Sequence, residues 1–268
     1  MQRREFLAAS AAVAVSAAGG GVTVAAAEGS ANQLIELRTY HFAKPEKRQA
    51  YESFLGEVMI PALGRAGVGP VGAFKLLAKD NPELKLQADA NDLYVVIPHK
   101  SAESFLSLAQ KLAADEAYQS AGRAVIAAAK ADPAYVRYDG SVILAFDGFP
   151  QVQAPTKSES RVVQLRIYES HSEERAARKI HMFNEGGEIA IFRKVGMNGV
   201  FFGRTLAGAK LPSLTYMLAF EDDEALKSAW NKFRVDPDWK KLSADQSYKD
   251  TVSTITNLIL RPVAGSQI

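Results

Sequence analysis

The stretch LIELRTY at Leu34–Tyr40 recurs as VVQLRIY at Val162–Tyr168, 128 residues further along the chain. Both copies place apolar residues at alternate positions, which predicts a β-strand. The patterns that follow each copy come in the same order, so the chain is built from two similar halves. This repeat decides the fold.

Each half contains six predicted elements in the order strand, helix, strand, strand, helix, strand. The first helices carry apolar stripes through Tyr51 and Phe54 in one half and through Ile180 and Phe183 in the other. Each of these helices is followed by a glycine, which adopts the left-handed conformation at a helix end with little steric strain. The remaining strands are expected at 72–77, 93–97 and 141–146 and at 200–205, 214–220 and 254–260, and the second helices at 102–111 and 223–233.

This order of elements is the ferredoxin-like unit, an α+β fold in which two helices cover one face of a sheet. The other face of each sheet needs a cover, and two tandem copies provide it when their sheets pack face to face. We therefore expect a closed, dimeric α/β-barrel type of fold within one chain; the same faces would also allow a homodimer. The expected domains are 32–148 and 161–263, joined by a linker at 149–160 that is rich in Pro, Gln and Ser.

The first 27 residues have the composition of an export signal. Arg3 and Arg4 precede an apolar run of Ala, Val, Ser and Gly that extends to Ala27. Adjacent arginines are typical of a twin-arginine signal. We expect cleavage after Ala27 and a periplasmic or otherwise exported protein with no stable membrane insertion. A retained membrane anchor is the alternative, and the three glycines at 19–21 disfavour it.

Composition excludes several classes of function. The 32 basic and 30 acidic residues give a net charge of +2, which argues against a nucleic-acid partner because such a protein needs a basic face. The absence of cysteine excludes thiol nucleophiles, disulfides and Cys-ligated metals. With four histidines, we expect no dedicated metal site. Phosphate-binding, dinucleotide-binding, GxSxG and HExxH motifs are missing from the sequence.

The sequence resembles the NIPSNAP family. The resemblance is clearest between Ile180 and Trp239, where it includes Glu185 and the sequences FRKVG at 192–196, FG at 202–203, LTY at 214–216, AW at 229–230 and PDW at 237–239. It is weaker across the first half, where Tyr118 takes the place of Trp239. The resemblance implies a dimeric α/β barrel and no catalytic residue. The wider fold includes haem enzymes and cofactor-free monooxygenases, which is an analogy of fold only.

An arginine followed two residues later by a tyrosine occurs in both halves, as Arg38 and Tyr40 and as Arg166 and Tyr168. Strand alternation places these residues on one face, opposite the set that begins with Ile35. We expect the arginine face to point into the barrel and the apolar face to lie beneath the helices. Arginine there could hold a carboxylate, an enediol or a phenolate. The alternative is an internal ion pair, such as Arg38 with Glu36 as a strand neighbour.

The histidines supply two further hypotheses. We expect His41 and His99 to emerge at the same end of the sheet, as a metal or acid–base pair or as two surface residues. His181, Glu185 and Glu188 would share one helical stripe, either as a metal site or as an exposed polar face. Trp230 and Trp239 are expected to anchor the core and loops. No residue is assigned as catalytic, and no cofactor is identified.

Three functions remain open. The first is an exported NIPSNAP-type protein that binds a small organic ligand between its two halves, with or without catalysis. The second is an oxidoreductase of the cofactor-free monooxygenase or haem type. The third is a scaffold for interactions without catalysis, which an interior lacking any cavity near Arg38 and Arg166 would favour.

Overall fold

The computed structural model describes residues 32–268, so the expected signal at 1–27 lies outside the described residues. Eight strands of this range close into one barrel in the order β1-β3-β2-β8-β5-β7-β6-β4. The first half supplies the sheet β4-β1-β3-β2 and the second half the sheet β8-β5-β7-β6, all with antiparallel neighbours. Both sheets have the strand order of a ferredoxin-like unit, so the expected α+β barrel is confirmed.

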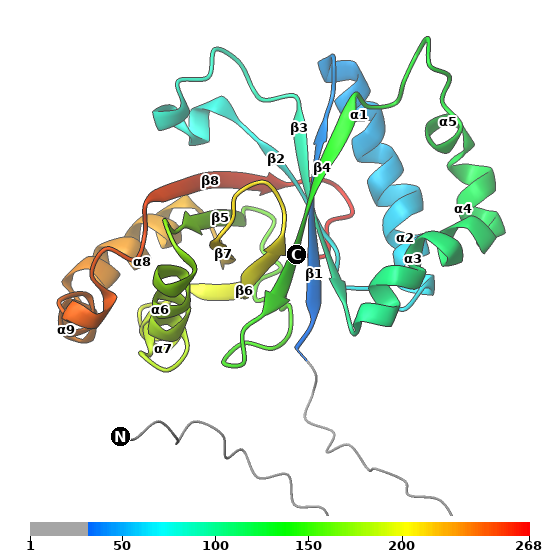
Figure 1. The fold of residues 1–268 in the computed structure, drawn as a ribbon. Helices are drawn as coiled ribbons and strands as arrows, with labels where there is room; N and C mark the ends of the chain where they lie inside the picture. Colours follow the sequence, from blue (N-terminus) through cyan, green and yellow to red (C-terminus); the bar gives the residue numbers. More distant parts are fainter. Residues whose placement is uncertain (1–31) are drawn as a thin grey trace, which may run out of the picture.

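The first half consists of four strands and the helices on their outer face (Figure 1). Its elements are β1 (Leu34–His41), α1 (Pro45–Phe54), the π-turn η1 (Leu55–Met59), α2 (Ile60–Arg65), β2 (Gly72–Leu76), the short turns η2 (Ala78–Asp80) and η3 (Pro82–Leu84), β3 (Asp92–His99), α3 (Ala102–Ala114), α4 (Glu116–Ala121), α5 (Arg123–Ile126) and β4 (Arg137–Ala145). Ser101 caps α3 by accepting a hydrogen bond from the Ser104 amide.

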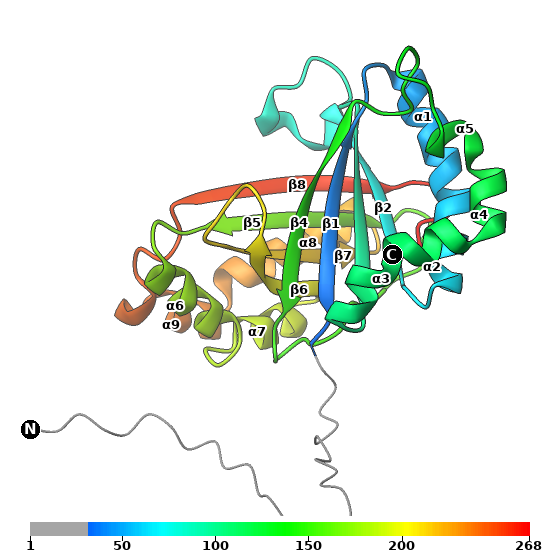
Figure 2. The same cartoon turned by 45° about the vertical axis from the view of Figure 1, so that its right-hand side comes forward.

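The second half repeats this plan. Its elements are β5 (Val162–Glu169), α6 (Glu173–Phe183), α7 (Glu188–Lys194), β6 (Asn198–Ala207), β7 (Ser213–Phe220), α8 (Asp223–Val235), α9 (Pro237–Ser243), the turn η4 (Gln246–Tyr248) and β8 (Thr254–Pro262). Asp222 caps α8 and Asp236 caps α9 through their side-chain carboxylates. Figures 1 and 2 show α6 to α9 on the side of the barrel away from α1 to α5.

Two seams join the sheets, and each pairs an edge strand of one half with an edge strand of the other. β2 pairs with β8, and β4 pairs with β6. Figure 2 shows the strands of the first half running across those of the second, as two sheets do when they close a barrel together. At the second seam Gly203 lies so close to β4 that an added Cβ would stand 2.5 Å from the Leu144 carbonyl oxygen.

Three apolar cores result, one inside the barrel and one beneath each set of helices. Ile35 and Leu37 lie in the barrel core, whereas Tyr40 and Tyr168 lie beneath the helices. The expected orientation of the strands was therefore wrong. Side chains from both sheets fill a small barrel, and the apolar alternate positions do so here. The arginine face lies under the helices.

The first helix of the second half also differs from expectation. Instead of continuing through 180–190, α6 ends at Phe183 and α7 begins at Glu188. Gly187 between them has φ of +88°, a left-handed conformation that glycine adopts without strain. The break separates Glu188 from the stripe that was expected to include His181.

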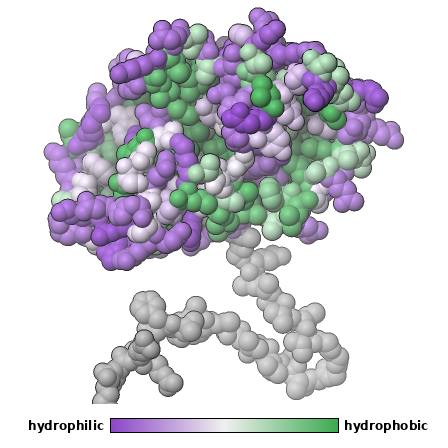
Figure 3. All heavy atoms as spheres, turned by 45° about the horizontal axis from the view of Figure 1, so that its top comes forward, coloured by the Kyte–Doolittle hydropathy of each residue, from purple (hydrophilic) through white to green (hydrophobic). Residues whose placement is uncertain are grey.

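The segment 149–160 has no helix or strand, but it is packed against the barrel. Val152 is buried in the barrel core, and its amide donates a hydrogen bond to the Gln33 side chain at 2.7 Å. Across residues 32–268, every helix is too short or too polar to cross a membrane. Polar side chains cover much of the face shown in Figure 3, with apolar patches between them.

Candidate functional site

A large cavity lies in the second half, between the outer face of the sheet and α6, α7, α8 and α9. Its volume is about 740 Å³. We call it the second-half pocket; it is lined chiefly by Arg166, Tyr168, Lys179, Glu188 and Trp230. Apolar side chains fill most of the barrel interior, and a smaller cavity lies between the two halves at one mouth of the barrel. The arginines that were expected in the interior line pockets on the opposite faces of the sheets.

Arg166 is the distinctive group of the second-half pocket. Its guanidinium carbon lies 4.8 Å from the centre of the Trp230 ring and 5.3 Å from that of Tyr168. Such stacking orients the guanidinium without neutralising its charge. Among the described residues, Arg166 forms no ion pair with a carboxylate, and its buried Nε has no hydrogen-bond acceptor. A buried donor without an acceptor is unfavourable.

Neighbouring hydrogen bonds hold the aromatic ring above Arg166 in place. Trp230 Nε1 donates to Gln164 Oε1 at 2.7 Å, and Gln164 Nε2 donates to Asn257 Oδ1 at 2.7 Å. The hydroxyls of Tyr168 and Tyr216 lie 3.0 Å apart. Burial raises the pKa of Tyr168, so its hydroxyl remains protonated at neutral pH. The walls around Arg166 are therefore fixed by neutral groups.

A buried ion pair closes the inner end of the pocket. Lys179 Nζ lies 2.8 Å from Glu188 Oε2, and the two side chains are 7% and 2% exposed. Lys179 also lies over the rings of Tyr168, Phe183 and Trp239. Burial raises the pKa of Glu188, and Lys179 opposes that rise. Glu188 forms its ion pair with Lys179, while Arg166, which lies beyond ion-pair distance, also acts to lower the Glu188 pKa.

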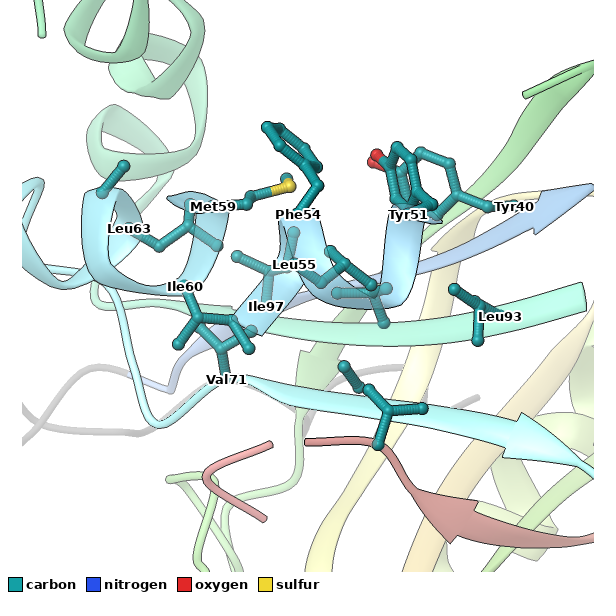
Figure 4. Close-up of a cluster of buried hydrophobic side chains, with 14 of the residues drawn as sticks. Tyr40, Tyr51, Phe54, Leu55, Met59, Ile60, Leu63, Val71, Leu93 and Ile97 are labelled. Carbon is teal, nitrogen blue, oxygen red and sulfur yellow. The ribbon is translucent and has the colours of Figure 1, made fainter. Parts of the chain in front are cut away.

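The first half has a corresponding cavity of about 500 Å³ around Glu36, Arg38 and Tyr138. We call it the first-half pocket. Arg38 Nε donates to Glu36 Oε1 at 2.5 Å and Nη2 donates to Glu36 Oε2 at 2.9 Å, while Nη1 reaches the Tyr40 hydroxyl at 3.2 Å. The internal ion pair considered from the sequence is thus present here. Tyr40 itself packs against Tyr51 with ring centres 4.8 Å apart (Figure 4).

His41 and His99 lie at opposite ends of the sheet, contrary to expectation. β1 and β3 are antiparallel, so His41 pairs with Asp92 and His99 with Leu34. The two histidines are roughly 20 Å apart along the strand. His99 is fully buried, with Nε2 3.6 Å from Glu36 Oε2. They cannot act as a pair.

His41 instead stands at one mouth of the barrel between two carboxylates. Its Nδ1 lies 2.9 Å from Asp92 Oδ1 and its Nε2 2.8 Å from Asp139 Oδ2. A cavity of about 340 Å³ opens here between the two halves and includes Thr39 and Lys210. Both ring nitrogens of His41 are occupied by carboxylates, so this mouth lacks the free histidine that an acid–base role needs.

The metal site considered at His181, Glu185 and Glu188 does not form. His181 Nδ1 bonds to the Tyr248 hydroxyl at 2.8 Å, while Glu188 turns inward to Lys179. Within residues 32–268 no group of three His, Asp or Glu side chains is arranged to hold a metal ion. The sequence analysis missed Lys179 and Trp230 as pocket residues. The contrast between Glu36 and Gln164 at matching positions was the signal that could have distinguished the two arginines.

Comparison with known proteins confirms the resemblance for the second half, since residues 163–267 match the NIPSNAP family model. No curated protein matches the chain in sequence. Proposed monooxygenases from Fusobacterium nucleatum and Lactobacillus acidophilus have similar structures, each with a TM-score of 0.58 and 10% identity. The alignments cover 87% and 86% of this chain and 93% and 94% of theirs. A NIPSNAP-like domain protein from Burkholderia xenovorans is 23% identical over 39% of this chain and 86% of its own, with a TM-score of 0.35.

Proposed function

We propose that this protein, whose second half is a NIPSNAP domain, binds a small organic anion in the second-half pocket. The observation that carries the proposal is Arg166, a cation that forms no ion pair among the described residues and lies over Trp230 and Tyr168 in the second-half pocket. Guanidinium donors suit carboxylates and phenolates, and aromatic walls suit a flat organic body. The composition of residues 1–27 supports binding in the periplasm.

The test is binding of para-fluorobenzoate, followed by fluorine NMR, to the wild-type protein and to Arg166→Gln. A charge-assisted hydrogen bond contributes about 1.5–3 kcal/mol, so the substitution should weaken binding by about tenfold or more. Arg204→Gln is the matched control, because Arg204 is exposed and outside the pocket. Unchanged affinity in Arg166→Gln would refute the proposal.

Neutral para-fluorobenzyl alcohol separates charge from shape. The wild-type protein should prefer the benzoate to the alcohol, because only the benzoate offers Arg166 a negative charge. Arg166→Gln should lose that preference and retain the alcohol. Equal binding of the two probes by the wild-type protein would indicate that the pocket selects for shape alone.

An oxidoreductase without a cofactor is a second candidate, because Arg166 places beside the pocket a cation that forms no ion pair among the described residues. Cations lower the energy of a phenolate or an enolate, the electron-rich form that an oxidation of such a compound would start from. Oxygen consumption with an activated phenol, abolished in Arg166→Gln, would support it. An oxygen-inert protein would exclude that substrate class.

Haem does not fit the second-half pocket. Among its lining residues in the described part of the chain there is no His, Met or Cys to serve as the usual axial ligand. The Tyr168 hydroxyl is directed to Tyr216. The cavities beside both arginines also count against a scaffold without ligands.

A further inference from the structure

The two pockets are built around arginines at matching strand positions, and a residue two positions before each arginine differs between the halves. Arg38 and Arg166 match in the repeat, and each is stacked on an aromatic ring: Tyr138 at 5.3 Å for Arg38 and Trp230 at 4.8 Å for Arg166. Two positions earlier, the first half has Glu36 and the second has Gln164. This difference changes the charge that each arginine presents.

In the first half, the arginine is neutralised by a carboxylate on its own strand. Glu36 accepts two hydrogen bonds from Arg38, and the two side chains are 11% and 15% exposed. Burial acts to raise the pKa of Glu36, but the contacts with His99 and Arg38 outweigh it and hold that pKa below its ordinary value. Glu36 therefore stays ionised, and the floor of the pocket carries no net charge.

In the second half, the matching residue cannot neutralise the arginine. Gln164 is an uncharged amide whose two polar atoms are occupied by Trp230 and Asn257. Arg166 consequently keeps its charge at the pocket wall, and its buried Nε has no acceptor among the described residues. The same fold position thus yields a cationic floor in one half and a neutral floor in the other.

The walls of the first-half pocket are those of a binding site for an apolar molecule. α3 lines it with Phe105, Leu108 and Leu112, and α4 adds Tyr118. Behind the floor, His99 is fully buried, and its Nε2 lies 3.6 Å from Glu36 Oε2.

We infer that the first-half pocket is a second binding site, which takes an uncharged molecule with an apolar body and one polar group. The residue at position 36 determines whether the first-half pocket binds an anion or an uncharged ligand, and the residue at position 164 does the same for the second-half pocket. The inference deepens the proposed function, because it rests on anion binding at Arg166. It assigns Glu36 and Gln164 as specificity-determining residues.

The first experiment converts the first-half pocket. In an Arg166→Gln background, which removes the anion site of the second half, Glu36→Gln should free Arg38 and restore para-fluorobenzoate binding. Adding Arg38→Gln should abolish it again. A folded Glu36→Gln, Arg166→Gln protein that fails to bind the benzoate would overturn the inference. Thermal unfolding monitored by circular dichroism establishes whether each variant is folded.

The reciprocal experiment decides the matter even if the Glu36→Gln protein does not fold. Gln164→Glu places a carboxylate beside Arg166 while keeping an acceptor for Trp230, and the Asn257 amide can turn to donate to it. This variant should bind para-fluorobenzoate at least tenfold more weakly and should still bind para-fluorobenzyl alcohol. Gln246→Glu, which adds the same charge on an exposed turn, is the matched control. Unchanged benzoate binding in Gln164→Glu would overturn the inference.

A third variant tests occupancy of the first-half pocket. Ala109 lines that pocket on α3, so Ala109→Trp fills it. Adding Ala109→Trp to the Arg166→Gln protein should weaken its binding of para-fluorobenzyl alcohol. An unchanged affinity for the alcohol would refute a neutral site in the first-half pocket. The proposed function and the inference drawn from it predict different outcomes. If Arg166→Gln leaves benzoate binding intact, the proposed function is wrong; if it abolishes binding but Gln164→Glu does not, only the inference is wrong.

Discussion

Replacing Lys179 by methionine should destabilise the protein more than any surface change, because it strands a buried carboxylate. Lys179 and Glu188 form an ion pair at 2.8 Å with side chains 7% and 2% exposed. Removing one partner of a buried pair typically lowers the free energy of unfolding by about 3–5 kcal/mol. For a chain of this size, that loss corresponds to a fall in Tm on the order of 10 °C.

The loss should depend on pH with a defined sign. Burial raises the folded-state pKa of Glu188 above its ordinary value of 4.5, and Lys179 opposes the rise. Lys179→Met removes that opposition, so the folded pKa rises further. Because the folded-state pKa of Glu188 is raised, protonation of Glu188 favours the folded state. Its contribution to the free energy of unfolding is fully present below pH 4.5 and is lost as the pH rises through the folded-state pKa. The variant should be least stable near neutrality and should recover towards pH 4.5.

Urea unfolding followed by circular dichroism, near neutral pH and near pH 4.5, measures this directly. The double variant Lys179→Met, Glu188→Gln removes the stranded charge and should regain much of the neutral-pH loss, because an uncharged pair costs far less to bury. The reasoning is refuted if the single and double variants unfold alike at neutral pH, or if the single variant shows no recovery in acid.

Three further predictions concern the barrel and its seams. Leu260→Ala should lower the free energy of unfolding by about 2–5 kcal/mol, against less than about 0.5 kcal/mol for the exposed Leu206→Ala; similar urea midpoints would contradict this. Gly203→Ala should cost about 1–3 kcal/mol by crowding β4, whereas Gly140→Ala meets open space and should be neutral by thermal unfolding. Arg261→Met, which removes an arginine bound to two aspartates, should lower Tm more at low salt than at high salt, and a salt-independent loss would count against it.

The order of elements and the closed barrel could be predicted because their causes are local. Apolar alternation, helix caps and glycine turns repeat in both halves, and an uncovered sheet face requires a partner. The direction in which each face points could not be predicted. Alternation identifies residues that share a face, but both faces are buried here, so Ile35 inside and Tyr40 outside carry the same apolar signal. The helices between β1 and β2 make these two strands parallel, and β3 lies between them in the opposite direction. His41 at the end of β1 and His99 at the end of β3 therefore lie at opposite ends of the sheet.

The candidate site was predictable in part. The repeat identifies Arg38 and Arg166 as matching residues, and the residue pair Glu36 and Gln164 shows that their surroundings differ. The ion pair of Lys179 with Glu188 could not be predicted, because it depends on the break between α6 and α7 that turns Glu188 inward. The apolar periodicity of the sequence does not reveal this break.

The two seams make one polypeptide do what two identical subunits do elsewhere. In a symmetric homodimer every substitution appears in both subunits, so a residue that suits one site is also present in the symmetry-related site. Here the matching positions are encoded separately, and natural selection can alter one without touching the other. Glu36 and Gln164 already differ at matching positions. A single chain with two sites of this kind can therefore hold two different ligands, which a symmetric homodimer cannot do with its matching sites.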